Sequence, residues 1–250
     1  MMQHIKSKSV RFMLGSVLVA GCLALPTYAV AQDAEYDNYD EQWDDYGVEE
    51  DPWEAFNRRV FRFNDVLDRW ALKPIAKGYQ KVTPDVVEDG VHNVLRNLGE
   101  ARNLTNNLLQ FKMHDAGIDT ARFLFNTTFG LFGFFDVATK MGLQRNDEDF
   151  GQTLGAWGIN SGPYMVLPFL GPSTVRDTAA IYPDHFSRPY RYISDVPVRN
   201  SMFALEIVDA RAKLLSAERL VIGDKYRFVR NAYLQNREFK VRDGEVVDDF

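Results

Sequence analysis

Cysteine and a surplus of basic charge are the two features that this chain most clearly lacks. Its 250 residues contain one cysteine, Cys22, which excludes an intramolecular disulfide and a cysteine-based metal site. Residues 33–51 carry ten acids and no Lys or Arg, and three basic residues precede position 12, so residues 52–250 have a formal charge of +1. A surface for nucleic acid needs a clear excess of Lys and Arg, so the composition predicts no nucleic-acid partner.

The common signatures of catalysis are missing as well. The chain has no G-x-S-x-G elbow, no H-E-x-x-H pair, no phosphate-binding loop and no dinucleotide-binding turn. His92, His114 and His185 lie far apart in the sequence and do not form a ligand set. The sequence therefore predicts a protein that is not an enzyme, with no catalytic residue, no cofactor and no metal.

Charge is absent from residues 150–175, FGQTLGAWGINSGPYMVLPFLGPSTV. A run of this length would be a candidate membrane span, but Pro163, Pro168 and Pro172 prevent one continuous helix. Irregular backbone at membrane depth is tolerated only where it is buried in protein or lines a cavity. The stretch is therefore either an apolar core loop or part of a path for lipid. In the second case its apolar side chains are candidates for contact with lipid: Tyr164, Met165, Leu167, Phe169 and Leu170.

A second uncharged segment, residues 123–135, ends in the phenylalanine-rich sequence FGLFGFF, directly before Asp136. These aromatic residues either pack against the rest of the domain or face lipid. The candidates for a lipid path in this segment are Phe129, Leu131, Phe132 and Phe134.

The N-terminus resembles an export signal, because basic residues precede an uncharged run over residues 12–31. Two cleavage sites are present. The sequence VAGC makes Cys22 a candidate lipidated N-terminus, whereas AVA at residues 29–31 fits ordinary signal cleavage, which the apolar residues after Cys22 favour slightly. We expect a signal peptide over residues 1–31, an acidic, disordered tether over 32–50, a helical domain over 51–240 and an acidic tail over 241–250.

Helical periodicity dominates after residue 51, and strand alternation is almost absent, which predicts an all-α domain. The first helix has an aromatic face of Trp53, Phe56, Phe63 and Trp70 with arginines opposite, which fits either a core helix or a helix at a membrane interface. We expect Pro74 to end this helix and Gly99 to end the next one.

Two later helices are each expected to turn their apolar side inward. In the first, Leu104, Leu108 and Phe111 face the core, and Asn103, Asn106 and Asn107 form the polar side. In the second, Phe203, Ile207 and Leu214 face the core.

Six segments together resemble the VacJ/MlaA family of outer-membrane phospholipid transport proteins. They are DPWEAFNRRVFRFND (51–65), KPIAKGY (73–79), NLGEARNLTNNLLQ (97–110), RFLFNTTFGLFGFFDVA (122–138), DFGQTLGAWG (149–158) and GPYMVLPFLGPSTVRD (162–177). They cover about half of the chain in order.

The resemblance implies a single helical ring with Gly/Pro-rich apolar loops, embedded in the inner leaflet of the outer membrane. It also implies transport of phospholipids that have strayed to the outer leaflet, through a central amphipathic channel to a periplasmic carrier, with a trimeric porin as scaffold. The alternative is a periplasmic structural protein that binds another envelope protein through the same aromatic faces.

Overall fold

The computed structural model describes residues 51–245, and these residues are predominantly helical. The signal peptide, Cys22, the acidic tether and the end of the acidic tail lie outside the described residues. The first helical rod comprises α1 (Glu54–Leu67), the π-helical turn η1 (Asp68–Leu72) and α2 (Lys73–Val82). Pro74 does not end this rod, as the sequence had suggested, because it occupies the first turn of α2, where its missing N–H is tolerated.

Two long helices follow and pack against each other, α3 (Asp85–Leu109) and α4 (Met113–Thr128). α3 passes through Gly99 without a break, so the expected end at that glycine is wrong. Two short helices come next, α5 (Val137–Lys140) and α6 (Phe150–Ala156).

The remaining elements are one hairpin and the C-terminal helices. Strands β1 (Tyr164–Leu167) and β2 (Gly171–Thr174) pair antiparallel, with Tyr164 opposite Thr174. Helix α7 (Val175–Phe186), the 3-10 turn η2 (Pro189–Tyr192), α8 (Val196–Leu214), the 3-10 turn η3 (Ala217–Leu220) and α9 (Lys225–Val241) complete the order. The all-α prediction is thus confirmed except for this hairpin, which lies within the uncharged stretch.

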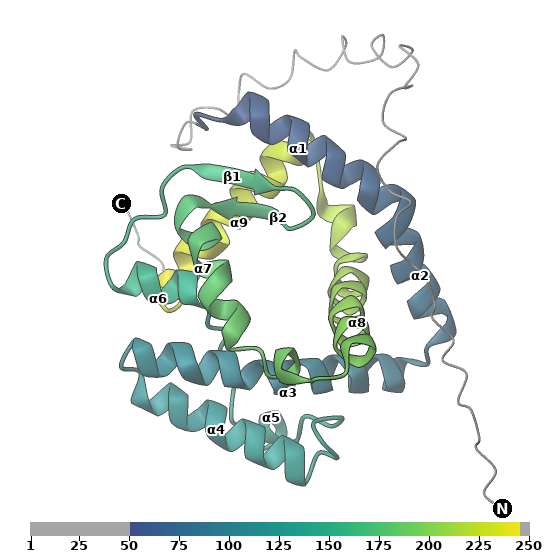
Figure 1. Ribbon diagram of the computed structural model, residues 1–250, viewed down its shortest axis with the longest axis vertical. Coiled ribbons are helices and arrows are strands. Elements are labelled where there is room, and N and C mark those ends of the chain that lie inside the picture. Colours follow the sequence, from purple (N-terminus) through teal and green to yellow (C-terminus); the bar gives the residue numbers. More distant parts are fainter. Residues whose placement is uncertain (1–50, 246–250) are drawn as a thin grey trace, which may run out of the picture. The chain divides into compact units, whose positions relative to one another are not determined.

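The elements of the described unit close into a ring (Figure 1). α1 contacts β1, β1 pairs with β2, β2 contacts α7, and η2 contacts both α7 and α8. α8 packs against α2, which returns through η1 to α1, so the circuit is complete. α3 runs along one side of the ring, touching α6, η2 and α8, and α4 covers its outer side.

Candidate functional site

The buried positions of residues 51–245 are mostly polar. All but one of the largest fully buried side chains are polar or charged, the exception being Val166; they are Asn57, Glu100, Asn103, Asn106, Asn107, Asp119, Arg122, Gln152, Thr153 and Thr174. Five of the eight buried hydrophobic residues are alanines. A water-soluble domain normally buries Leu, Ile, Val and Phe, so this chain has the reverse arrangement.

Helix α3 shows the reversal most clearly. Asn103, Asn106 and Asn107 are buried, whereas Leu108 and Phe111 are exposed. The expected orientation is therefore wrong, and α8 repeats the error, since Phe203, Ile207 and Leu214 are exposed. Periodicity identifies a stripe of one character but does not say which stripe faces the interior.

Several buried amide groups of α3 have specific partners, whereas Asn97 Oδ1 and Asn107 Oδ1 have none. Asn103 Nδ2 donates to Glu100 Oε2 and to the carbonyl of Asn146, at 3.1 and 2.7 Å. Thr153 Oγ1 donates to Asn106 Oδ1 at 2.9 Å. Because each buried polar group that finds a partner avoids most of its desolvation cost, these bonds make a polar interior stable.

Asp119 of α4 is the most perturbed carboxyl of this interior. It is fully buried and accepts a hydrogen bond of 2.7 Å from Asn107 Nδ2. Burial raises the pKa of Asp119 to about 7, although the bond from Asn107 lowers it in part. The contact between α3 and α4 therefore contains a group that titrates near neutral pH.

Arg122 anchors the loop that follows α4. Its Nε donates to Glu100 Oε1 of α3 at 2.9 Å, and its Nη2 donates to Asp136 Oδ2 at 3.1 Å. Burial would raise the pKa of Asp136, but hydrogen bonds from Thr139 and Arg122 outweigh it and lower that pKa to about 2. The carboxylate stays charged, and the loop is fixed at its base.

The tip of this loop displays apolar side chains on a strained backbone. Leu131 and Phe132 have φ of 52° and 59°, and 64% and 79% of their surface is exposed. Left-handed backbone costs a non-glycine residue about 1–2 kcal/mol. Phe129 is also exposed, whereas Phe134 turns inward, where a Cβ on Gly90 of α3 would lie 2.0 Å from its ring.

Two asparagines of α1 hold the hairpin. Asn57 Nδ2 donates to the carbonyl of Tyr164, and Asn57 Oδ1 accepts from the N–H of Val166, at 3.1 and 2.9 Å. Asn64 repeats the pattern seven residues later, with the carbonyl of Leu167 and the N–H of Phe169 at 2.9 and 2.8 Å. The two amides thus bind the edge of β1 as a neighbouring strand would.

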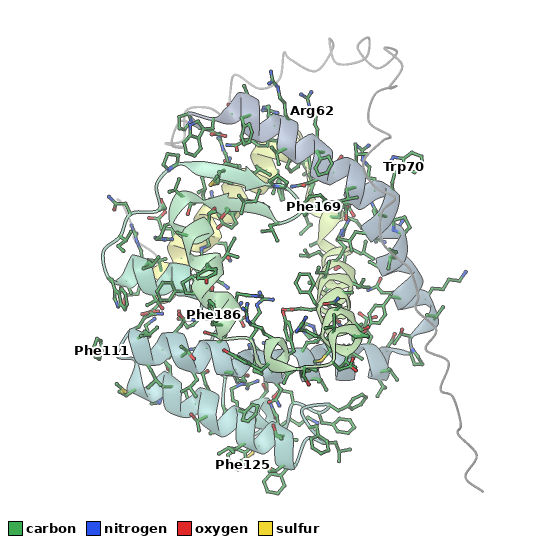
Figure 2. All side chains as sticks on the ribbon, viewed as in Figure 1. Arg62, Trp70, Phe111, Phe125, Phe169 and Phe186 are labelled. Atoms are coloured by element: carbon green, nitrogen blue, oxygen red, sulfur yellow. The ribbon has the colours of Figure 1, made fainter. Side chains whose placement is uncertain are left out.

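This arrangement places the hairpin tip against the aromatic face of α1. The rings of Phe63 and Phe169 meet edge to face, with centroids 5.3 Å apart. Phe169 is 72% exposed at φ of 65°. Figure 2 shows Phe169 and Phe186 toward the middle of the ring, whereas Trp70 and Phe111 point away from it.

The candidate residues chosen from the sequence differ in how far they are exposed. Trp53, Phe56, Phe63 and Trp70 are all exposed, so the reading of α1 as an ordinary core helix is wrong. Leu170 is exposed too, and Met165 and Leu167 are half-buried. Tyr164 is 4% exposed and packs against Tyr226 and Tyr233 in the small hydrophobic core, so we leave it out of the lipid path.

Sequence reasoning missed the groups that organise this surface, namely Asn57, Asn64, Glu100 and Arg122. One signal was available, because asparagines seven residues apart lie on one face of a helix. Nothing in the sequence indicates that this face meets the edge of a strand.

Within residues 51–245, no helix is both long enough and apolar enough to cross a membrane. The same residues contain no group of three or more His, Cys, Asp or Glu side chains arranged to hold a metal ion.

Comparison with known proteins identifies relatives over most of the chain. The model of the family described as MlaA lipoprotein matches residues 49–240. A Haemophilus influenzae protein, the intermembrane phospholipid transport system lipoprotein MlaA, is 36% identical over 204 residues, 79% of this chain and 82% of its own length. The Escherichia coli K12 protein of that name is 33% identical over 239 residues, 93% of this chain and 88% of its own.

A solved structure is similar as well. It comes from work on the structural basis for maintenance of bacterial outer membrane lipid asymmetry. It superposes with a TM-score of 0.68 at 33% identity and covers 77% of this chain and 99% of the solved chain. Sequence and fold therefore lead to the same group of proteins.

Proposed function

This chain belongs to the MlaA family, and from that premise we propose that it transports phospholipids between membranes and so maintains the lipid asymmetry of the outer membrane. In this proposal it removes phospholipids that have strayed into the outer leaflet and passes them to a carrier in the periplasm. Transport is passive and takes its direction from its partners.

The observation that carries this proposal is the inversion of polar and apolar side chains. A polar interior held by Arg122, Glu100 and the asparagines of α3 is combined with an exterior rich in exposed Phe, Trp and Leu. Apolar surface gains about 25 cal/mol per Å² when it leaves water, so this exterior favours an apolar environment. Lipid acyl chains supply that environment.

We propose that the ring lies in the inner leaflet of the outer membrane, reached by export through the N-terminal signal. The apolar side chains of α1 and of the loop after α4 then contact acyl chains. A position within one leaflet does not require a helix that spans the membrane. The relatives are named lipoproteins, which supports lipidation of Cys22 in this chain.

We place the path for lipid beside the hairpin. Phe169 and Leu170 are exposed at its tip, and Met165 and Leu167 lie along β1. Residues of the other segment, Phe129, Leu131 and Phe132, are then the candidates for contact with surrounding membrane lipid, and Phe134 supports their loop.

Two protein partners complete the proposal, both taken from the family resemblance. One is a trimeric porin that holds the ring in the membrane, and the other is the periplasmic carrier that accepts the lipid. Cross-linking from photo-reactive residues at exposed positions such as Phe111 or Trp70, followed by mass spectrometry, tests for a porin directly.

Site-specific photo-crosslinking in cells tests the lipid path. A photo-reactive residue at Met165, Leu167 or Phe169 should capture phospholipid, whereas the same residue at exposed Lys77 of α2 serves as a control for background labelling. A folded, membrane-inserted protein that gives no lipid adduct at any of the three positions contradicts the path.

Deletion of the gene tests the function itself. Phospholipid should accumulate in the outer leaflet, and tolerance to SDS with EDTA should fall. If both stay unchanged, and a carbonate wash releases the protein from membranes, the periplasmic scaffold alternative takes its place.

A further inference from the structure

A pocket of about 180 Å³ is lined by residues of α3, η2 and α8. In Figure 1, η2 and α8 lie on the side of α3 opposite to α4. Its apolar lining includes Leu95, Leu98 and Pro189. Pockets for drug-sized molecules usually measure about 300–1,000 Å³, so this one suits a small group rather than a whole lipid.

Cationic side chains dominate the rest of the lining. His92, Arg96, Gly99 and Arg102 of α3 all line the pocket, although a step of six residues turns Arg102 about 120° from Arg96 around the helix axis. Because a helix rises about 1.5 Å per residue, the backbone positions of Arg96 and Arg102 are about 9 Å apart along the axis. The missing side chain at Gly99 lets the guanidinium of Arg145 approach α3, with its Nη2 3.1 Å from the place of a Cβ.

Three of the basic side chains in the lining already have acidic partners. Arg188 Nη1 bonds Glu206 Oε2 at 3.0 Å, His92 Nδ1 lies 2.7 Å from Asp209 Oδ2, and Arg145 Nε bonds Asp147 Oδ1 at 2.7 Å. Each lining carboxylate thus faces a basic side chain, although Asp209 Oδ1 has no hydrogen-bond partner.

Arg96 and Arg102 are different. Neither guanidinium forms an ion pair with any carboxylate of residues 51–245, and Arg102 Nε is buried without a hydrogen-bond partner. The charge of Arg102 acts on Asp149 and Asp184, but Arg237 binds Asp149, while Phe150 N and Asn106 bind Asp184. Burial and the neighbouring charge of Arg145 lower the pKa of Arg96.

An unpaired guanidinium in a half-buried pocket is unfavourable unless an anion joins it. Arginine forms bidentate, charge-assisted hydrogen bonds with phosphate, and two arginines that line one pocket can hold one phosphate from two sides. The apolar lining suits the glycerol carbons beside that phosphate.

We propose that this pocket binds the phosphate of a phospholipid headgroup through Arg96 and Arg102, and that it prefers a headgroup with net negative charge. The preference follows because four arginines, Arg96, Arg102, Arg145 and Arg188, face only two acids, Glu206 and Asp209, in the lining, so the pocket is positively charged. This inference rests on the proposed function for the source of the phosphate.

Calorimetric titration of the full-length protein in detergent tests the proposal. The probes are dihexanoyl-phosphatidylglycerol, dihexanoyl-phosphatidylcholine and inorganic phosphate, each kept below any micelle-forming concentration. The double variant R96Q/R102Q removes the two unpaired charges. The matched control is K77Q/R219Q, which removes two exposed charges that form no ion pair within residues 51–245.

We expect the wild-type protein and the control to bind phosphatidylglycerol at least tenfold more tightly than phosphatidylcholine. The double variant should lose about tenfold in affinity for phosphatidylglycerol for each arginine removed, and with it the preference. Its melting temperature should not fall, since an unpaired repulsive charge is removed; a large fall would mean that the arginines are structural and would overturn the proposal.

Three other results also overturn it: equal binding of the two lipids by wild type, unchanged binding in the double variant, or inorganic phosphate binding as tightly as phosphatidylglycerol, which identifies a site for free phosphate. The proposed function is tested separately by the deletion experiment. A deletion without effect on outer-leaflet lipid removes the transport function but leaves the measured headgroup preference intact.

Discussion

Substitutions of Phe132 test separately how this residue affects the free energy of unfolding and the affinity for membranes. Its side chain is 79% exposed, and its backbone is held at φ of 59°. We compare two substitutions, Phe132→Gly and Phe132→Ala, because both remove the ring and only glycine relieves the left-handed backbone.

The expected effect on folding follows from the backbone. Alanine retains the left-handed cost of about 1–2 kcal/mol, and glycine avoids it but loses about 0.5–1 kcal/mol through the greater freedom of its unfolded chain. Phe132→Gly should therefore have a higher free energy of unfolding than Phe132→Ala, by about 0.5–1 kcal/mol. For a domain of this size that difference corresponds to a melting temperature higher by roughly 1–4 °C.

The expected effect on membrane binding is the same for both variants. Burying a phenylalanine side chain contributes about 1.5–3 kcal/mol, so losing it should weaken binding to liposomes by at least about tenfold. Thermal unfolding in detergent measures the first effect, and liposome flotation measures the second.

Leu124 of α4 supplies the matched control, since it is also exposed but lies in regular helix. There the order must reverse, with Leu124→Ala more stable than Leu124→Gly by about 1 kcal/mol. If glycine is the less stable replacement at both positions, the left-handed strain assigned to Phe132 is refuted. Unchanged liposome binding of both Phe132 variants refutes its contact with lipid.

Three further predictions concern the amides of α1, the buried acid and the N-terminus. Asn57→Leu leaves the buried Val166 N–H and Tyr164 carbonyl without partners and should lower the free energy of unfolding, measured in urea, by about 2–6 kcal/mol. Asn64→Leu should lower it less, because the partners of Asn64 reach solvent. An equal or reversed ranking contradicts the role of Asn57. Because the pKa of Asp119 is raised from 3.8 to about 7, the wild type should lose stability as pH rises through that interval, and Asp119→Asn should remove most of this loss when unfolding is followed from pH 4 to 8. Cys22→Ser should abolish palmitate labelling of the mature protein, and a mature protein that begins at Gln32 in both forms speaks for ordinary signal cleavage instead.

The sequence predicted the helical class well because helical periodicity over ten or more residues is a strong local signal. The predicted helix ends at Pro74 and Gly99 are wrong, because proline and glycine end helices often but not always, and their effect depends on where in the helix they lie. Pro74 falls in the first turn of α2, and Gly99 lies where α3 is covered by the guanidinium of Arg145, 3.1 Å from the place of a Cβ. The hairpin was missed because its strands have four residues each and one edge is completed by side chains of α1.

The orientation of the helices was the larger error, and it concerns the site directly. The reading of α3 and α8 assumed that apolar stripes turn inward, which holds when water is the solvent. Apolar side chains such as Phe111 and Phe203 are exposed instead. The sequence of a single helix does not show which of its faces is turned outward. The exposed aromatic face of α1 and the uncharged loops were the available signals for the apolar surroundings that we propose.

The polar interior and the apolar exterior have one physical explanation. Where lipid surrounds a protein, apolar side chains gain little by packing inward, so close packing of small residues and satisfied polar contacts must hold the structure together. The five buried alanines supply the first, and the bonds of Arg122, Glu100 and the α3 asparagines supply the second. Helix α3 carries both the polar side chains that stabilise the ring and the unpaired Arg96 and Arg102. The same helix therefore contributes to the stability of the fold and to the proposed binding of a lipid headgroup.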